Sequence, residues 1–156
     1  AVHAAGRHEM LRGNAYDTLA PMIRSFYQAH PECMPNSLKQ QFVVTQDEFM
    51  QIIETDRHMR CAIVDLSVND DTMQTWLAFL GLKSTRANAD ALPLDAAHLP
   101  TANAIFSVQR KKGSGHWVYV TPQGKHLLWG VPQTPDNALQ RLQMTYSEID
   151  AVYPLG

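Results

Sequence analysis

Apolar side chains in the first half of the chain recur every three or four positions, which is the spacing of helices that bury one face. Polar N-cap candidates precede these stretches and turn residues follow them. The expected helices run from Asp17 or Thr18 to Ala29, from residues 33–36 toward Phe42, from Thr45 through Ile53, and from residues 69–71 to Gly81. A short buried strand is expected at residues 61–66. Pro21 falls in the first turn of the first helix, where its missing N–H removes no helical hydrogen bond.

After about residue 100 the pattern changes from that of helices to that of strands. β-branched and aromatic residues dominate three short runs that are separated by glycine-containing turns. The runs predict an antiparallel meander with strands at 104–108, 116–120 and 126–129; residues 92–94 and 99–100 are expected in a loop or edge strand, and residues 134–149 in a largely helical tail. Helices first and antiparallel strands after predict an α+β fold, with the helices packed on one side of the sheet.

The composition is that of an ordinary globular domain. The chain has 156 residues, 45% hydrophobic and 18% charged, with a formal net charge of −2. It therefore lacks the basic excess that nucleic-acid binding requires. The basic run at residues 110–112 is expected to be a solvated turn, with binding of a peptide or acidic partner as the alternative. The length suits a single domain over residues 17–156, after a lead-in over residues 1–16.

The sequence leaves the compartment open. No apolar run approaches the roughly 18–20 residues of a membrane span, and the N-terminus lacks the pattern of a secretory signal. The first residue is Ala1 rather than Met, so removal of an upstream segment stays open. The cytoplasmic face of an exporter and the periplasm or exterior are both compatible with this.

Two cysteines, Cys33 and Cys61, are too few for a disulfide scaffold, and no Cys or His pair has structural-zinc spacing. A single bridge between them stays open. Cys61 is expected in the core of a strand. Cys33 lies where a helix is expected to begin, and a helix N-terminus or a nearby imidazolium favours the thiolate. His116 opens a predicted strand behind a flexible turn, so we predict a thiol nucleophile paired with this histidine. His126, which also opens a strand, is the alternative base.

The residues around Cys33 resemble a known motif. The string ECMPNSL at 32–38 resembles the E/D-C-G-P-x-S/A-L motif of the papain-like double-glycine leader peptidases, which process bacteriocin precursors and occur fused to ABC exporters or as separate proteins. The strings LGLK at 80–83, ALPL at 91–94, GHWVYV at 115–120 and YSEI at 146–149 follow the order of that family's later motifs. The resemblance spans about residues 28–156.

The resemblance implies a papain-like cysteine peptidase fold and a Cys-His site. Cys33 is then the nucleophile, His116 the general base, and Gln28 with the Cys33 backbone N–H the oxyanion hole. Gln133 stands near the place where the family carries an acid, and its amide oxygen is expected to orient His116. The implied substrate is a peptide or secreted precursor cut after two small residues, commonly glycines. Export machinery is an implied partner, and no metal or organic cofactor is implied.

Three positions depart from the family pattern. Met34 replaces the glycine after the cysteine and is expected to narrow the cleft or crowd the oxyanion site. Gln28 is one residue closer to the cysteine than in the family. No acid lies near Pro132, and an amide at Gln133 does not stabilise an imidazolium as a carboxylate does. Two alternatives therefore stand beside the peptidase. One is a peptidase-like domain that binds a leader peptide or secretion partner with little or no turnover. The other is a non-enzymatic envelope assembly or interaction domain.

Overall fold

A computed structural model describes residues 1, 4–6, 15–33, 51, 69–112, 115–128 and 131–155. The chain forms two compact units, the first made of residues 2 and 6–68 and the second of residues 1, 3–5 and 69–156. The described part of the first unit is helical, and the second unit holds a six-stranded sheet. None of the helices within these ranges is both long enough and apolar enough to span a membrane.

The first unit contains helix α1 (Ala15–Ala29) and the 3-10 turn η2 (Pro31–Cys33). The predicted apolar stripe of α1 is confirmed, because the side chains at its four helically spaced positions are buried: Leu19, Met22, Ile23 and Phe26. The helix begins at Ala15, earlier than expected, so Pro21 lies in its second turn. The expected placement of this proline in the first turn was wrong, and its ring removes one helical hydrogen bond.

Three other predicted elements of this unit lie outside the described residues. They are the helix toward Phe42, nearly all of the helix from Thr45 through Ile53, and the strand at 61–66 that contains Cys61. Within the second of these, Gln51 is helical. These elements remain predictions.

Helix α5 (Asp70–Phe79) begins and ends where the sequence predicts. Its N-cap is Asn69, whose side-chain oxygen accepts a hydrogen bond from the Thr72 backbone N–H at 2.8 Å. Asp70 and Asp71 place negative charge at the positive end of the helix dipole. Gly81 follows the helix with φ of 81°, the left-handed conformation that terminates helices and favours glycine.

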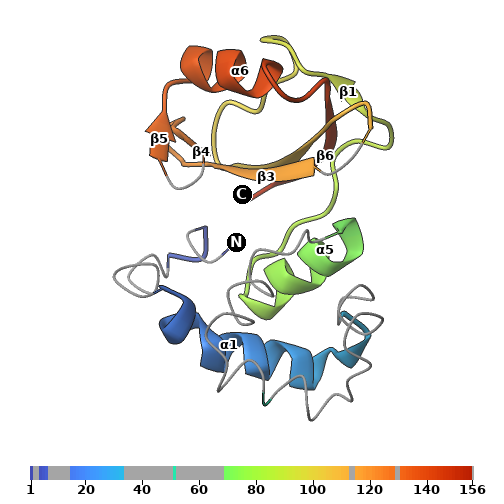
Figure 1. Cartoon of the computed structure of the whole chain (residues 1–156), viewed down its shortest axis with the longest axis vertical. Helices are drawn as coiled ribbons and strands as arrows, with labels where there is room; N and C mark the ends of the chain where they lie inside the picture. Colours follow the sequence, from blue (N-terminus) through green and yellow to red (C-terminus); the bar gives the residue numbers. More distant parts are fainter. Residues whose placement is uncertain are drawn as a thin grey trace. The chain divides into compact units, whose positions relative to one another are not determined.

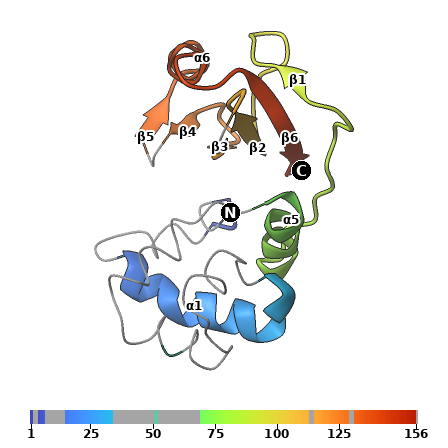
Figure 2. The same ribbon diagram turned by 45° about the vertical axis from the view of Figure 1, so that its right-hand side comes forward.

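The second unit is built on one antiparallel sheet (Figures 1 and 2), whose strand order is β1-β6-β2-β3-β4-β5. The strands are β1 (Leu92–Pro93), β2 (Ala104–Gln109), β3 (Gly115–Val120), β4 (His126–Leu128), β5 (Val131–Gln133) and β6 (Glu148–Pro154). The consecutive antiparallel pairs β2-β3 and β3-β4 confirm the predicted meander. Helices together with an antiparallel sheet confirm the α+β class.

Helix α6 (Pro135–Gln143) covers one face of this sheet (Figures 1 and 2). Its buried Ala138 and Leu142 belong to a hydrophobic cluster with alternate residues of the strands, such as Phe106 and Val118. Tyr153 pairs with Ile105, which precedes Phe106 on β2. Because neighbouring residues of a strand point to opposite faces, Tyr153 lies on the face opposite to Phe106. The alternation of side chains therefore gives the sheet two buried faces.

Strand β6 begins within the last two residues of an expected helix. The sequence predicts a largely helical tail through residue 149, but only α6 is helical, and β6 lies between β1 and β2. Ile149, Ala151 and Tyr153 are buried, whereas the residues between them are partly exposed, which is the period of two of a strand. β6 pairs with β2 on one side and with β1 at Glu148 and Ile149 on the other, where Ala87 and Asn88 bond to its backbone further along.

The two outer strands of the sheet each carry a proline. Pro93 lies in β1 and Pro132 in β5, at opposite edges. Proline has no N–H to donate, and the edge of a sheet is where strands tolerate it. The expected edge-strand character of residues 92–94 is confirmed by β1.

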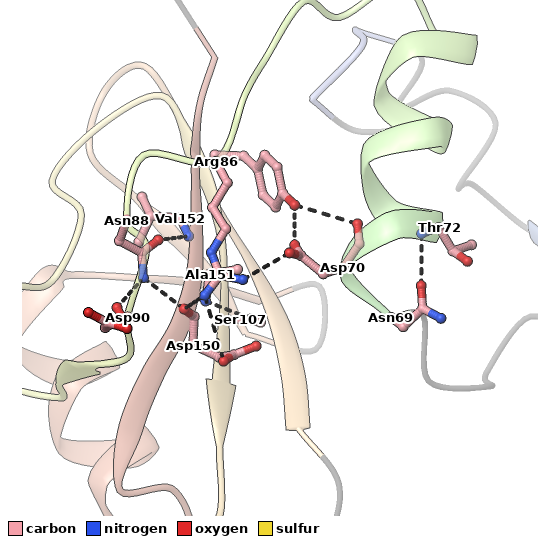
Figure 3. Close-up of polar contacts among 11 residues, drawn as sticks. Asn69, Asp70, Thr72, Arg86, Asn88, Asp90, Ser107, Asp150, Ala151 and Val152 are labelled. Carbon is pink, nitrogen blue, oxygen red and sulfur yellow. Dashed lines mark hydrogen bonds and ion pairs between the residues drawn. The ribbon is translucent and has the colours of Figure 1, made fainter.

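A polar network joins α5 and the segment after it to β6 (Figure 3). Arg86 donates to the Asp70 carboxylate at 2.9 Å and to the Asp150 backbone carbonyl at 2.6 Å. Asn88 donates to the same Asp150 carbonyl at 2.7 Å and accepts a hydrogen bond from a β6 backbone N–H at 2.9 Å. The Tyr153 hydroxyl donates to the Asp70 carboxylate. Burial, and after it this carboxylate, raises the pKa of Tyr153 well above its ordinary value.

Candidate functional site

His116 is the second residue of β3 and lies on the face of the sheet that α6 covers. It alternates with Val118 and Val120, which belong to the core cluster, and it pairs with Val108 of β2. The side chain is half-buried, and the loss of water lowers the pKa of its imidazole below the ordinary value of 6.5. At neutral pH the ring is therefore uncharged and has a nitrogen lone pair that accepts a proton.

The ring of Tyr146 packs against His116. The two ring centroids are 6.3 Å apart and the ring planes differ by 12°, an offset parallel stack. The Arg110 guanidinium carbon lies over the same tyrosine ring, 5.7 Å from its centroid. We call these three residues the aromatic stack. They meet where β2 ends and β3 begins.

Sequence reasoning missed Tyr146 because it falls in the predicted helical tail. In the structure, the Tyr146 backbone N–H donates to the Leu142 carbonyl of α6 at 2.8 Å. The next residue, Ser147, donates its backbone N–H to the Gln109 carbonyl at the end of β2, at 2.9 Å. These two bonds hold the connection between α6 and β6 against the sheet, and they bring Tyr146 to His116. The only sequence signal was the alternation of polar and apolar residues that begins at position 148.

Gly115 brings the start of β3 close to β2. A Cβ atom at this position would lie 2.6 Å from the Val108 carbonyl oxygen and 2.6 Å from the Gln109 side-chain nitrogen. The backbone oxygen is fixed by the strand, so only glycine fits without a shift of the backbone. The close approach therefore positions the residue that follows it, His116.

In the first unit, Cys33 is the last residue of η2 and has a free, half-buried thiol. Its backbone N–H donates to the His30 carbonyl at 3.0 Å and closes the turn. The family resemblance implies that this N–H holds an oxyanion. In η2 the group is already engaged, and an oxyanion donor must point at the reacting oxygen instead. The predicted helix start after Cys33 lies outside the described residues.

Gln28 is exposed near the end of α1, and the residue before it, Tyr27, is buried. Burial, and after it the negative charge of a Cys33 thiolate, raises the pKa of Tyr27 to about 12. Tyr27 is therefore a neutral hydroxyl close enough to the thiol to sense its charge. Sequence reasoning did not single it out, because at its position in α1 a tyrosine is usual in a buried stripe.

The register of the sheet separates Gln133 from His116. Gln133 pairs with His126, and His126 pairs with Val120, which is four residues along β3 from His116. Two strand spacings across the sheet and four residues along it correspond to a separation on the order of 15 Å. The amide of Gln133 does not reach the imidazole, so the expected orienting role does not fit this sheet.

The alternative base, His126, is fully buried. Its Nε2 lies 2.8 Å from the Pro100 carbonyl oxygen, and because a carbonyl only accepts, this nitrogen carries the proton. Burial lowers the pKa of the imidazole, opposed by the backbone carbonyls around it. A ring without exposed surface does not reach a substrate, so His126 serves to tie the loop before β2 to β4.

The candidate residues are divided between the two units. Gln28 and Cys33 belong to the first unit, and His116 and Gln133 belong to the second. Among the described residues, no three His, Cys, Asp or Glu side chains gather as metal ligands would. No family model, curated protein or solved structure matches the chain. The chemistry open to the described residues is that of a free thiol in one unit and a neutral imidazole in the other.

Proposed function

We propose that the chain is a papain-like cysteine peptidase that cleaves a leader or precursor peptide after small residues. The observation that carries the proposal is the condition of His116. This imidazole is uncharged at neutral pH, half-buried and stacked on Tyr146. It follows Gly115, where a Cβ would meet the Val108 carbonyl oxygen. A general base needs these two properties: an uncharged ring and a fixed position.

In the proposed reaction, the Cys33 sulfur attacks the scissile carbonyl carbon while His116 takes up the thiol proton. The bond between carbon and nitrogen then breaks, His116 gives the proton to the departing amine, and the acyl group stays on Cys33 as a thioester. A water molecule that gives its proton to His116 hydrolyses the thioester, and the proton returns to the sulfur. Gln28 is the proposed donor to the oxyanion, since the Cys33 N–H is engaged in η2.

The first test measures thiol reactivity. Single-cysteine variants Cys61→Ser and Cys33→Ser are alkylated with iodoacetamide at pH 7, so that each thiol is measured alone. We expect Cys33 to react at least about tenfold faster than Cys61, because an uncharged imidazole that takes up the thiol proton converts the thiol to the reactive thiolate. His116→Ala in the Cys61→Ser background should remove most of this difference. Equal and slow labelling of both thiols would contradict the proposal.

A matched control separates a specific role of His116 from the loss of any histidine. His98 is exposed, and its Nδ1 lies 2.7 Å from an Asp95 carboxylate oxygen. His98→Ala therefore removes an imidazole that already has an acidic partner. It should leave the alkylation rate of Cys33 unchanged within a factor of about two.

The second test measures turnover. A peptide with a central glycine pair is incubated with the protein, and products are identified by mass spectrometry. Cleavage after the second glycine, absent with Cys33→Ala and reduced by Gln28→Ala, is the expected result. Removal of one oxyanion donor typically lowers kcat by about 10²–10³-fold. Cleavage that survives Cys33→Ala would rule out this nucleophile.

Two observations favour a second candidate, a peptidase-like domain that binds its peptide without turnover. Gln133 lies far from His116, and the Cys33 N–H is already used by the turn. This candidate predicts that the glycine-pair peptide binds but is not cut, whether or not Cys33 reacts quickly with iodoacetamide.

A further inference from the structure

The connection between β2 and β3 begins with three consecutive basic residues, Arg110, Lys111 and Lys112, and all three are exposed. We propose that they form a subsite for acidic side chains of the peptide substrate, next to His116. The inference rests on the proposed function, because it takes the ligand to be the substrate of the peptidase. We call these three residues the basic turn.

The basic turn has no acidic partner among the described residues. The ion pairs among the described residues involve other cations, such as Arg86 with Asp70. Glu148, which pairs with Gln109 in the sheet just before the turn, forms no ion pair with any of the three. Three positive charges therefore stand side by side in a chain whose formal net charge is −2.

Arg110 is held in place by the aromatic stack. Its guanidinium lies over the Tyr146 ring, and the same ring is stacked on His116. Packing on an aromatic face leaves the N–H groups at the rim of the guanidinium open, and the rim is the part that binds a carboxylate with two parallel hydrogen bonds. A side chain that is already ordered loses less entropy on binding. The stack thus fixes a carboxylate-binding group at a constant place relative to the candidate base.

The chemistry favours an acidic peptide over a nucleic acid. Binding to a phosphate backbone requires a basic surface that follows many phosphates, whereas this chain is slightly acidic and the basic turn offers three cations. Three adjacent cations suit two or three carboxylates of one peptide segment. The expected substrate therefore carries Asp or Glu within a few residues of the scissile bond.

The test uses the Cys33→Ala variant of the full chain, so that binding is measured apart from cleavage. Two fluorescein-labelled peptides share a central glycine pair; one carries three flanking glutamates and its twin carries three glutamines. Affinity is read by fluorescence anisotropy at low and at physiological salt. Exposed ion pairs contribute about 1.5- to 5-fold each in affinity, so the glutamate peptide should bind about tenfold more tightly at low salt. Screening should shrink this preference as salt increases.

Replacement of the basic turn by three glutamines should abolish the preference. The matched control replaces two exposed lysines elsewhere in the same unit, Lys83→Gln with Lys125→Gln, and should keep it. Tyr146→Leu should weaken the preference by about two- to fivefold by releasing Arg110, and Tyr146→Phe should restore it because the ring is retained.

Equal binding of the two peptides, or a preference that survives the triple replacement, would overturn the inference. Tighter binding of a DNA duplex or of anionic vesicles through the same three residues would also overturn it, in favour of another class of partner. If the glutamate peptide binds preferentially but the chain that retains Cys33 does not cleave it, the subsite proposal stands and the peptidase proposal is wrong. The two proposals therefore fail separately.

Discussion

The polar network of Figure 3 can be tested with a single substitution, Arg86→Leu. The change keeps an apolar stem beside β6 but removes the hydrogen bonds from Arg86 to the Asp70 carboxylate and to the Asp150 carbonyl. It leaves Asp70 with the Tyr153 hydroxyl and with water. The expected result is a lower free energy of unfolding with an unchanged m-value.

The size of the effect follows from exposure. Hydrogen bonds to charged groups contribute about 1.5–3 kcal/mol each. The side chains of Arg86 and Asp70 are 29% and 34% exposed, so water replaces part of what is lost. The Nε atom of Arg86 is buried and has no hydrogen-bond partner among the described residues, and removing it relieves a cost. Together these considerations give a loss of about 2 kcal/mol.

The assay is urea unfolding at pH 7, followed by tryptophan fluorescence. The midpoint should fall while the m-value stays constant. A double-mutant cycle with Asp70→Asn should show a coupling of about 1 kcal/mol, because the two side chains share one ion pair. The exposed control Lys83→Gln should change stability by less than about 0.5 kcal/mol. An Arg86→Leu effect as small as that of the control would refute the reasoning that this network holds α5 to the sheet.

Two further predictions concern the histidines and the glycine of the sheet. Gly115→Ala should lower the free energy of unfolding by about 1–3 kcal/mol, because the added Cβ would meet the Val108 carbonyl oxygen. The same clash would displace His116, so the proposed Cys33-His116 pair predicts slower alkylation of Cys33. A loss of stability without any change in alkylation would contradict this. The pKa of His116 and of His126 lies below 6.5 in the folded chain, so the unfolded chain takes up protons first and stability should fall as pH drops below about 6.5. The slope is at most about 1.4 kcal/mol per pH unit for each histidine. Urea unfolding of His126→Leu between pH 7 and 5 should show a smaller slope, and an unchanged slope would exclude His126 as a source.

The parts of the fold that depend on local chemistry could be predicted from the sequence. Asn69 caps α5 and Gly81 ends it, since a cap needs only a side-chain acceptor and a glycine nearby in the chain. Strands β2 to β4 follow from short apolar runs and tight turns. Each of these signals depends on residues that lie within about ten positions of one another in the chain.

The parts that depend on long-range pairing could not be predicted. Residues 148 and 149 were expected at the end of a helix, and they belong to β6 because residues 148–154 pair with β2 and β1. The position of β6 also decides where Tyr146 lies, so the aromatic stack was not visible in the sequence. The orienting role expected of Gln133 does not fit for the same reason. Its distance from His116 depends on the register of β4 and β5, which no motif encodes.

The prolines at the two edges of the sheet bear on how another chain could pair with this unit. Pro93 and Pro132 each remove a backbone donor from an outer strand, and an incoming chain that extends a sheet depends on an unbroken row of such donors. A peptide bound to this unit would therefore be contacted through its side chains and would not pair as a seventh strand. The same two residues discourage one copy of the protein from joining its sheet to that of another.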